Sequence, residues 1–462
     1  MNIAEEIFQR CDPDAVAVVQ KGTSYSYREL DALAREIAVD IVAKNSTHSP
    51  IRIGLRCRDG YQYIAFALGI LRAHACFVPI PPEISEAEEK KLIETLHLQA
   101  ILSEVAGPAI YSYEPIHGEN PAWQHEFELL NPALIRFSSG TTGKSKGVLL
   151  SHETLIDRIQ AANAGLKIGA NDRVLWVLGM SHHFAVSILL YLWHGAAIIL
   201  PESHLAGDIL EAATTHSASV FYAAPFHYII LTAGQDKIDW PSLRLAVSTT
   251  ASLPEDIAKS FAETSGIHPA QALGIIEVGL PFINSNQPEK RPSSIGKAQP
   301  AFDVLLMNGD GTPCKPGEPG ELFIKGPGIF DAYIDPWKQR IDLLKDGVWF
   351  STGDLAHADS DGHYYLQGRL KSVINVGGMK FFPEEVEKVL CKHASVIEAR
   401  VISRQHPNFG SIPVAEVVAS SEIRAVELLS LCKRHLARYK IPAEIVFVES
   451  IPKTPSGKVL RR

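Results

Sequence analysis

The chain has 462 residues, of which 46% are hydrophobic and 21% are charged, a globular composition and a length sufficient for roughly two to four domains. Its 44 basic and 52 acidic residues give a net charge of −8, which argues against a sequence-independent grip on nucleic acid. The six cysteines are sparse and form no Cys-x-x-Cys pair, which favours reduced thiols in a cytoplasmic protein over disulfides or a zinc site.

The first half of the chain alternates apolar, β-branched runs with helical patterns. Residues 26–43 carry apolar side chains at helical spacing, and residues 252–266 do the same, with Ser252 as a plausible cap and Gly266 as a stop. This alternation predicts βαβ units and mostly parallel sheets. The runs that we interpret as buried strands are 15–19, 51–55, 133–137, 173–178, 196–200, 219–224 and 243–248.

The longest apolar run, residues 184–200, is interrupted by His194 and Gly195. It therefore predicts a buried helix, a turn and a strand rather than a membrane span. The N-terminus is acidic and lacks the apolar core of a signal peptide.

The pattern changes after about residue 300. Residues 302–326 contain short strands separated by Gly, Pro and Asp turns, which indicates a small antiparallel β unit. Further on, helical patterns (384–393, 422–439) alternate with strand patterns (399–405, 415–420). We therefore predict an α/β fold with two domains. Residues 1–369 would form a large domain of mostly parallel sheets flanked by helices plus the small β unit, and residues 370–462 a small mobile α+β domain.

A polar loop, SSGTTGKSKG, occupies residues 138–147 directly after a predicted strand. Its glycines let the backbone approach an anion, and its amides, hydroxyls and lysines can donate hydrogen bonds to phosphate. A Walker loop would need glycine where this chain has Ser138, and a helix directly after it, where the sequence is apolar and β-branched. The loop is thus a phosphate site of another kind, or else a polar surface turn.

Several further motifs stand in order along nearly the whole chain. They are SYSYRELDALA (24–34), GILRAHACFVPIPPE (69–83), GELFIKGPGIFDAY (320–333), STGDL (351–355), GRLKSVINVGG (368–378) and PKTPSGKVLRR (452–462). Together with the loop they resemble the signatures of the adenylate-forming superfamily, which comprises acyl- and aryl-CoA synthetases, peptide-synthetase adenylation domains and luciferases. The resemblance implies that a carboxylate attacks the α-phosphate of ATP, forms an acyl adenylate and expels pyrophosphate.

The resemblance implies which residues bind ATP. Asp354 would accept hydrogen bonds from the ribose hydroxyls and Arg369 would grip ribose or phosphate, with a turn aspartate and a surface arginine as the structural alternatives. Lys458 would bridge the carboxylate and the α-phosphate and stabilise the transition state, unless it is a solvated terminal lysine. The loop residues that would hold the β- and γ-phosphates are Ser138, Ser139, Gly140, Thr141, Thr142, Gly143 and Lys144, of which Thr141 would also be a metal ligand.

Glu277 lies in ALGIIEVG, where the family usually has an aromatic residue, Gly, any residue, Thr and Glu. Gly274 and Glu277 match this pattern, whereas Leu273 replaces the aromatic residue and Ile276 the threonine. The resemblance implies that Glu277 binds Mg²⁺ next to the phosphates, because a hard cation takes oxygen ligands. Gly274 would border the nucleotide, and adenine would pack on Leu273 and on the backbone near residues 248–254.

The resemblance also implies two catalytic steps joined by a hinge. The small domain would deliver Lys458 for adenylation and then rotate about Lys371 so that another face meets the thiol acceptor. Gly377 and Gly378 would border the pantetheine tunnel, since glycine suits close approach of a ligand to the backbone. Lys380 would steer a phosphopantetheine or be a surface charge.

The acid pocket is indicated by the segment 179–193. Peptide-synthetase domains place an aspartate there for the substrate ammonium, and this segment contains no acid, so an α-amino acid is disfavoured. His182 or His183 fits the place where acyl- and aryl-CoA synthetases carry a pocket histidine or aromatic residue, unless these are packed core histidines. An apolar aliphatic or aromatic acid is favoured. Further candidates for the pocket are Phe184, Ser187, Ala224 and Ser248.

The sequence therefore predicts a ligase that uses ATP and Mg²⁺ to activate a small carboxylic acid. The acceptor would be coenzyme A or the phosphopantetheine of a freestanding acyl or peptidyl carrier protein. One alternative is a non-catalytic member of the fold that binds nucleotide or acyl ligand, which the departures at Leu273 and Ile276 would suit. The other is a Walker-type hydrolase.

Overall fold

The computed structural model of the protein describes residues 1–45, 50–106, 110–138, 146–234, 237–376, 379–406, 410–453 and 459–460. Contacts divide the chain into two compact units. The first unit consists of residues 1–138, 146–303 and 324–350. The second, as far as it is described, consists of residues 304–323 and 351–460.

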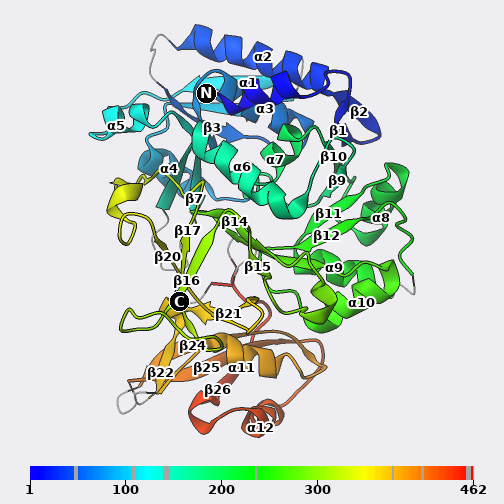
Figure 1. Ribbon diagram of the computed structural model, residues 1–462, viewed down its shortest axis with the longest axis vertical. Helices are drawn as coiled ribbons and strands as arrows, with labels where there is room; N and C mark the ends of the chain where they lie inside the picture. Colours follow the sequence, from blue (N-terminus) through cyan, green and yellow to red (C-terminus); the bar gives the residue numbers. More distant parts are fainter. Residues whose placement is uncertain are drawn as a thin grey trace. The chain divides into compact units, whose positions relative to one another are not determined.

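The first unit contains an eight-stranded sheet whose middle is parallel (Figure 1). Both edges are antiparallel. A strand, not a helix, follows the segment 139–145, because β8 pairs with β7 as an antiparallel hairpin. The chain thus lacks the strand–loop–helix order of a Walker site. The strand order is β19 (Lys338–Gln339), β18 (Ala332–Tyr333), β8 (Lys146–Ser151), β7 (Pro132–Ser138), β4 (Cys76–Pro79), β3 (Arg52–Arg56), β5 (Ala100–Glu104) and β6 (Tyr111–Pro115).

The first unit also contains a nine-stranded sheet that is parallel from β13 to β1. Antiparallel strands close its two ends. The order is β15 (Lys297–Ala298), β14 (Gly279–Ile283), β13 (Ala270–Ile275), β12 (Leu245–Ser248), β11 (Val220–Ala223), β9 (Arg173–Trp176), β10 (Ala197–Leu200), β1 (Val16–Gln20) and β2 (Thr23–Ser26).

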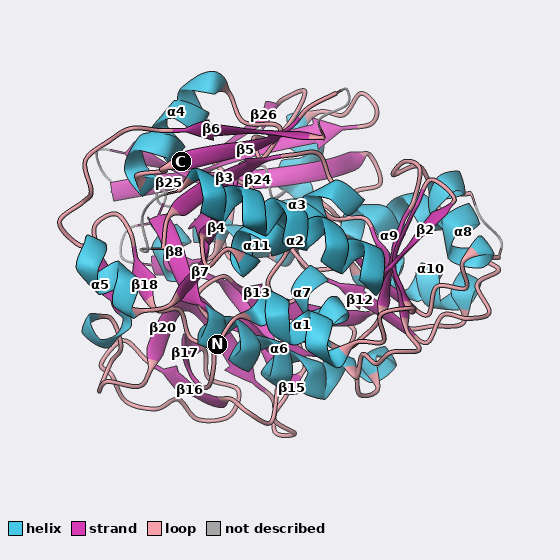
Figure 2. Ribbon diagram, turned by 90° about the horizontal axis from the view of Figure 1, so that it is seen from above, coloured by secondary structure: helices cyan, strands magenta, loops and turns pink. Residues whose placement is uncertain are grey.

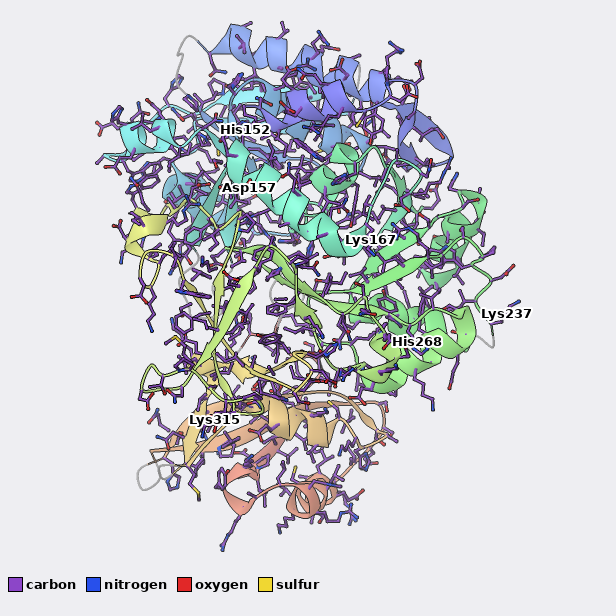
Figure 3. The ribbon with its side chains drawn as sticks, in the orientation of Figure 1. His152, Asp157, Lys167, Lys237, His268 and Lys315 are labelled. Atoms are coloured by element: carbon purple, nitrogen blue, oxygen red, sulfur yellow. The ribbon has the colours of Figure 1, made fainter. Side chains whose placement is uncertain are left out.

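Helices lie between these two sheets (Figure 2). Helix α3 (Tyr61–Arg72) contacts β3 and β4 of one sheet and β1 of the other, and α6 (His152–Leu166) contacts β7, β8 and β14. His152 and Asp157 mark α6 in Figure 3, and Lys167 ends it in a left-handed conformation. His152 Nδ1 accepts from the Ile3 N–H at 3.1 Å, and burial lowers the pKa of this imidazole to about 3, so it is neutral at pH 7. Helices α1 (Ile3–Arg10), α2 (Tyr27–Lys44) and α7 (Ile188–Trp193) complete this group.

Outer helices cover the remaining faces of both sheets. Helices α8 (Ala206–Thr215), α9 (Pro225–Thr232) and α10 (Glu255–Ser265) pack with Leu175, Phe221 and Ala246 of the nine-stranded sheet. Helices α4 (Glu86–Leu96) and α5 (Gln124–Leu129) pack with Ile135 and Leu149 of the other. Because side chains alternate along a strand, the neighbours Trp176, Tyr222 and Val247 face the inner helices instead.

The second unit is built on two smaller sheets. One has the order β16 (Asp303–Met307), β17 (Gly320–Lys325), β20 (Phe350–Ala358) and β21 (Tyr364–Arg369). The other has the order β23 (Met379–Phe381), β22 (Ile374–Val376), β25 (Gly410–Ala419) and β24 (Val396–His406), with β26 (Glu444–Phe447) parallel to β25. Helices α11 (Pro383–Leu390) and α12 (Ala425–His435) bury Val386, Leu390, Leu428 and Cys432 in its core. Short 3₁₀ turns are η1 (Pro288–Lys290), η2 (Arg340–Asp342), η3 (Leu370–Ser372) and η4 (Arg438–Lys440).

The predicted α/β class, with a large sheet-rich N-terminal region and a smaller α+β region, is confirmed. The run 184–200 is a helix, turn and strand, and no helix among the described residues is both long and apolar enough to cross a bilayer. All six cysteines are free.

The predicted cap at Ser252 is wrong. The Leu253 N–H donates to Gln271 Oε1 at 2.9 Å, so the chain stays extended to Pro254, the actual N-cap of α10. Gly266 ends that helix at φ 77°, as expected.

A capping box begins α2 and provides a test of local stability. Ser26 Oγ accepts from the Glu29 N–H at 3.2 Å, and the Glu29 carboxylate accepts from the Ser26 N–H at 2.7 Å. Replacing Ser26 with Ala should lower the free energy of unfolding by about 1 kcal/mol, because helix amides lose their acceptor. Urea unfolding would measure this. Ser24→Ala, at an exposed position of β2, is the control and should change stability by less than about 0.5 kcal/mol. Equal effects of the two substitutions would contradict the capping argument.

Candidate active site

The predicted pocket residues follow the carboxyl ends of neighbouring parallel strands. Residues 182–184 and Ser187 follow β9, Ala224 follows β11, and Ser248 ends β12. Glu277 lies in the turn after β13. Carboxyl ends of parallel strands meet at one edge of a sheet, where open α/β folds bind their ligands. Tertiary structure thus brings these pocket candidates and Glu277 to a common edge of the sheet.

The two predicted pocket histidines have different surroundings. His182 Nε2 lies 2.8 Å from Glu83 Oε1, and its side chain is only 16% exposed. Burial lowers the pKa of His182, Glu83 opposes this shift, and the positive charge of Arg136 adds to it. The ring of His183 meets Trp176 edge-on at 6.3 Å between centroids. His182 thus contacts a carboxylate, whereas the described contact of His183 is aromatic.

Phe184 is part of an aromatic cluster at this edge. It is 4% exposed, and its ring centroid lies 5.3 Å from that of Phe77 and 5.8 Å from that of Tyr63. Tyr63 comes from α3 and Phe77 from β4, so the cluster joins the two sheets through the inner helix layer. These rings supply the apolar surface that an aliphatic or aromatic acid would need.

The remaining pocket candidates are small residues. Ser187 and Ser248 are 2% and 1% exposed, and neither hydroxyl has a hydrogen-bond partner within the described residues. Strand alternation places Ser248 on the face of Ala246, among the outer helices, and not on the face of Tyr222. Ala224 caps α9, and its N–H donates to His227 Nδ1 at 3.3 Å. Ser248 thus lies at the predicted edge but on the outer face of the sheet.

The Glu277 carboxylate is positioned by Tyr333 of β18. Tyr333 Oη donates to Oε1 at 2.9 Å, and the backbone carbonyl of Glu277 accepts from the Phe330 N–H at 2.8 Å. The other carboxylate oxygen makes no hydrogen bond within the described residues. A single carboxylate with an available oxygen suits Mg²⁺, which usually takes one or two carboxylates beside substrate phosphates. In the described part of the chain, no three His, Cys, Asp or Glu side chains cluster as a metal site.

Gly274 is exposed on β13, two residues before the Glu277 turn begins. A Cβ at this position would meet nothing closer than the Gly279 carbonyl at 3.9 Å, which is an ordinary contact. Packing within the protein therefore gives no reason for a glycine here. A glycine here leaves room for close approach of a ligand to the backbone.

Sequence reasoning missed Arg158, which holds the Glu277 turn. Arg158 lies on α6 and is 3% exposed. Its Nη1 donates to the Ile276 carbonyl at 2.7 Å, and its Nε donates to the Gly328 carbonyl. Burial lowers the pKa of this guanidinium to about 9, while Asp331 and Glu277 stabilise its charge. Its only signal in the sequence is an arginine on an otherwise apolar helix face.

Arg136 was also missed. It lies on β7, and its Nε is buried without a hydrogen-bond partner in the described part of the chain. Burial lowers the pKa of Arg136 to about 10, and Glu277 and Tyr63 oppose this shift. The sequence did contain a feature that could have identified Arg136, because the buried strand pattern ALIRF is interrupted by this one charged residue.

The predicted ribose-binding pair lies in the second unit. Asp354 and Arg369 are register partners on β20 and β21, with Arg369 Nε 2.7 Å from Asp354 Oδ1. Asp354 is 5% exposed. A carboxylate has acceptor sites beyond those that one arginine occupies, so the pair is compatible with accepting from hydroxyls. Lys371 is exposed in η3.

Some predicted residues lie outside the described part of the chain. Ser138 ends β7, but the phosphate loop beyond it is not among the described residues. The predictions that fall outside are those for Ser139, Gly140, Thr141, Thr142, Gly143, Lys144, Gly377, Gly378 and Lys458.

Comparison with known proteins identifies the family. The family model described as AMP-binding enzyme matches residues 6–334, and the AMP-binding enzyme C-terminal domain matches residues 385–458. The chain belongs to the AMP-binding enzyme family. This confirms the resemblance to the adenylate-forming superfamily that the motifs indicated.

Curated relatives of this AMP-binding enzyme include CoA ligases. A sulfoacetate–CoA ligase of Cupriavidus necator is 32% identical over 337 residues, covering 71% of this chain and 66% of that ligase, just under two thirds of its length. A feruloyl-CoA synthase of Amycolatopsis sp. is 28% identical over 481 residues, covering 98% of this chain and 96% of that synthase. Among solved structures, ATP-bound MatB from Rhodopseudomonas palustris superposes with a TM-score of 0.88 at 23% identity, covering 100% of this chain and 97% of that one. That likeness confirms the fold.

The surroundings of His182 lead to a prediction about its titration. Its NMR pKa should lie below the ordinary value of about 6.5 because burial disfavours the charged imidazole. Glu83→Gln should lower this pKa further by removing a nearby negative charge, and Arg136→Met should raise it by removing a positive one. A pH titration of the ring resonance, assigned through His182→Gln, measures both shifts. If neither substitution shifts the pKa of His182, or if the shifts have the opposite sign, the two charges do not act on this imidazole as the structure indicates.

Proposed function

We propose that this chain uses ATP to convert a carboxylic acid into an acyl adenylate and then transfers the acyl group to a thiol. The observation that carries the proposal is the match of both family domains together with an ordered motif series ending in Lys458. Further support comes from two relatives, which are named as a sulfoacetate–CoA ligase and a feruloyl-CoA synthase. Coenzyme A is therefore the proposed acceptor, and a carrier-protein phosphopantetheine is the alternative that the experiments below separate.

Each part of the proposed chemistry has a proposed residue. The acid would lie against Phe184 and His182, with its carboxylate directed to the α-phosphate. The loop from Ser138 to Lys144 would hold the β- and γ-phosphates, and Asp354 with Arg369 would bind the ribose. As oxygen attacks phosphorus, negative charge crowds at the reaction centre, and a lysine ammonium there lowers the barrier. We assign that role to Lys458.

Glu277 is the proposed ligand for Mg²⁺, together with Thr141. The hydrogen bond from Tyr333 orients one carboxylate oxygen, and the other is available to the metal. Bound Mg²⁺ would neutralise charge on the leaving pyrophosphate. Arg158 keeps the turn in place through the Ile276 carbonyl, so it acts as a positioning residue.

The thiol step requires a second arrangement of the small domain. We propose residues 1–369 and 370–462 as the two functional domains, with Lys371 as the hinge. Lys371 is exposed in a short 3₁₀ turn directly after β21, where a change of φ and ψ disturbs little packing. Gly377 and Gly378 would then border the pantetheine.

Pyrophosphate exchange tests the activity. With an acid substrate present, the native chain should incorporate labelled pyrophosphate into ATP, and thioester should form when coenzyme A is added. Thioester with a carrier protein but not with coenzyme A would favour the alternative acceptor. ATP binding by calorimetry without exchange for any acid in a broad panel would instead indicate the non-catalytic binding protein that the replacements Leu273 and Ile276 would suit.

Lys458→Ala separates the two steps. The substitution should lower the rate of adenylation by about a thousandfold or more, since an electrostatic contact of the transition state is lost. Thiolysis of a preformed acyl adenylate should be nearly unchanged, because the second arrangement presents another face of the small domain. Single-turnover assays of each half-reaction measure this, with Lys453→Ala as a matched control near the same end of the chain. Equal loss of both half-reactions would contradict the two-step account.

A further inference from the structure

We propose that Tyr63 and Arg136 form an anion-binding subsite beside Phe184 and His182, which recognises a second anionic group, a carboxylate or sulfonate, on the acid. This inference rests on the proposed function, because it names the substrate class of the same site. The sequence alone favoured a purely apolar acid. The subsite instead favours an acid that carries a second negative charge at the end opposite its reacting carboxylate.

Tyr63 provides a buried donor at this position. It lies on α3, is 0% exposed, and its hydroxyl has no hydrogen-bond partner within the described residues. Its ring is 5.8 Å from that of Phe184 and 6.1 Å from that of Phe77. A buried hydroxyl without a partner costs about 1–3 kcal/mol, so natural proteins usually satisfy it. A bound ligand is one way to do so.

Arg136 provides a second donor and a charge. It lies on β7, with Leu134 on the same face of the strand and Ile135 on the other. No ion pair or hydrogen bond of its side chain is found in the described part of the chain, and its Nε is buried. Leu134 pairs with Phe77 of β4, so Arg136 lies two residues further along the same face of β7, next to the strand whose Phe77 contacts Tyr63. Its charge also influences the titration of Tyr63 and His182.

The charge balance favours an anion over water. Among the described residues, Glu277 is the carboxylate that stabilises the Arg136 cation, and it stabilises Arg158 together with Asp331. When Glu277 binds Mg²⁺, as proposed above, its negative charge is shared with the metal. Arg158 keeps Asp331 as a second stabilising carboxylate, whereas the Arg136 cation is then left without compensation. An unpaired charge in a region shielded from water is costly. A water molecule could satisfy the Tyr63 hydroxyl but would leave this charge unbalanced.

A carboxylate or sulfonate satisfies both groups at once. Each such group has several acceptor oxygens, and guanidinium donates to them through charge-assisted hydrogen bonds, often bidentate. Tyr63 Oη can donate to the same group. The reacting carboxylate of the acid must meet the α-phosphate, so the anion held by this pair belongs to the opposite end of the substrate.

The experiment compares dicarboxylic acids with their half-amides of equal length in pyrophosphate exchange. The native chain should prefer at least one diacid. Arg136→Met should lower kcat/KM for that diacid about tenfold to a hundredfold, the loss of one charge-assisted hydrogen bond, and leave the half-amide nearly unchanged. Tyr63→Phe should show a smaller loss of the same selectivity. Arg35→Met, on the exposed face of α2, is the matched control.

Binding without turnover provides a second readout. The diacid alone should raise the melting temperature of the native chain and of Arg35→Met, and not that of Arg136→Met. Equal loss with diacid and half-amide would overturn the proposal, because Arg136 would then hold the reacting carboxylate. A change confined to the KM for ATP would overturn it in favour of a phosphate contact.

The outcomes also separate this inference from the proposed function. Exchange with monoacids but no selective binding of any diacid would overturn the subsite and leave the ligase activity standing. Diacid binding that depends on Arg136, without exchange for any acid, would support the subsite and overturn the ligase activity.

Discussion

One buried guanidinium, that of Arg158, holds the turn on which the candidate site depends. Its donors bind the carbonyls of Ile276 and Gly328, so α6 is tied to two segments some fifty residues apart in sequence. A Cβ at Gly328 would clash with the Arg158 side chain, and the residue has φ 70°, so glycine is needed there for both space and backbone conformation. The position of the Glu277 carboxylate follows from these contacts and from Tyr333, which completes its support.

Charge explains why the interior of the site is suited to anions. The charge of Glu277 stabilises the cations of both Arg136 and Arg158. Each of the two guanidinium groups has a buried nitrogen without a hydrogen-bond partner among the described residues. Asp331 also stabilises Arg158, so the excess of positive charge lies at Arg136, in a region where burial weakens solvation. Phosphates and acid anions are the ligands that such a region stabilises. The aromatic cluster around Phe184 provides the apolar complement.

Much of the fold could be predicted because it is encoded locally. The runs at 51–55 and 219–224 became β3 and β11 within one residue at each end, since β-branched residues between helical patterns specify buried parallel strands. The helix 26–43 was predicted from its periodicity and is α2. The cap at Ser252 failed because Gln271, eighteen residues away, binds the Leu253 amide and keeps the chain extended. A local rule cannot include such a contact.

The sequence by itself determined the family, the order of the sheets' strands and helices along the chain, and the candidate residues in the motifs, because periodicity and motif spacing are properties of neighbouring residues. Only the tertiary structure decided that Tyr63, His182 and Glu277, from three separate segments, lie within electrostatic reach of Arg136. It also decided that Ser248 faces the outer helices. The physical reason is that pairing between distant strands sets which side chains share a face and which charges lose their water, and neither can be read from one segment alone.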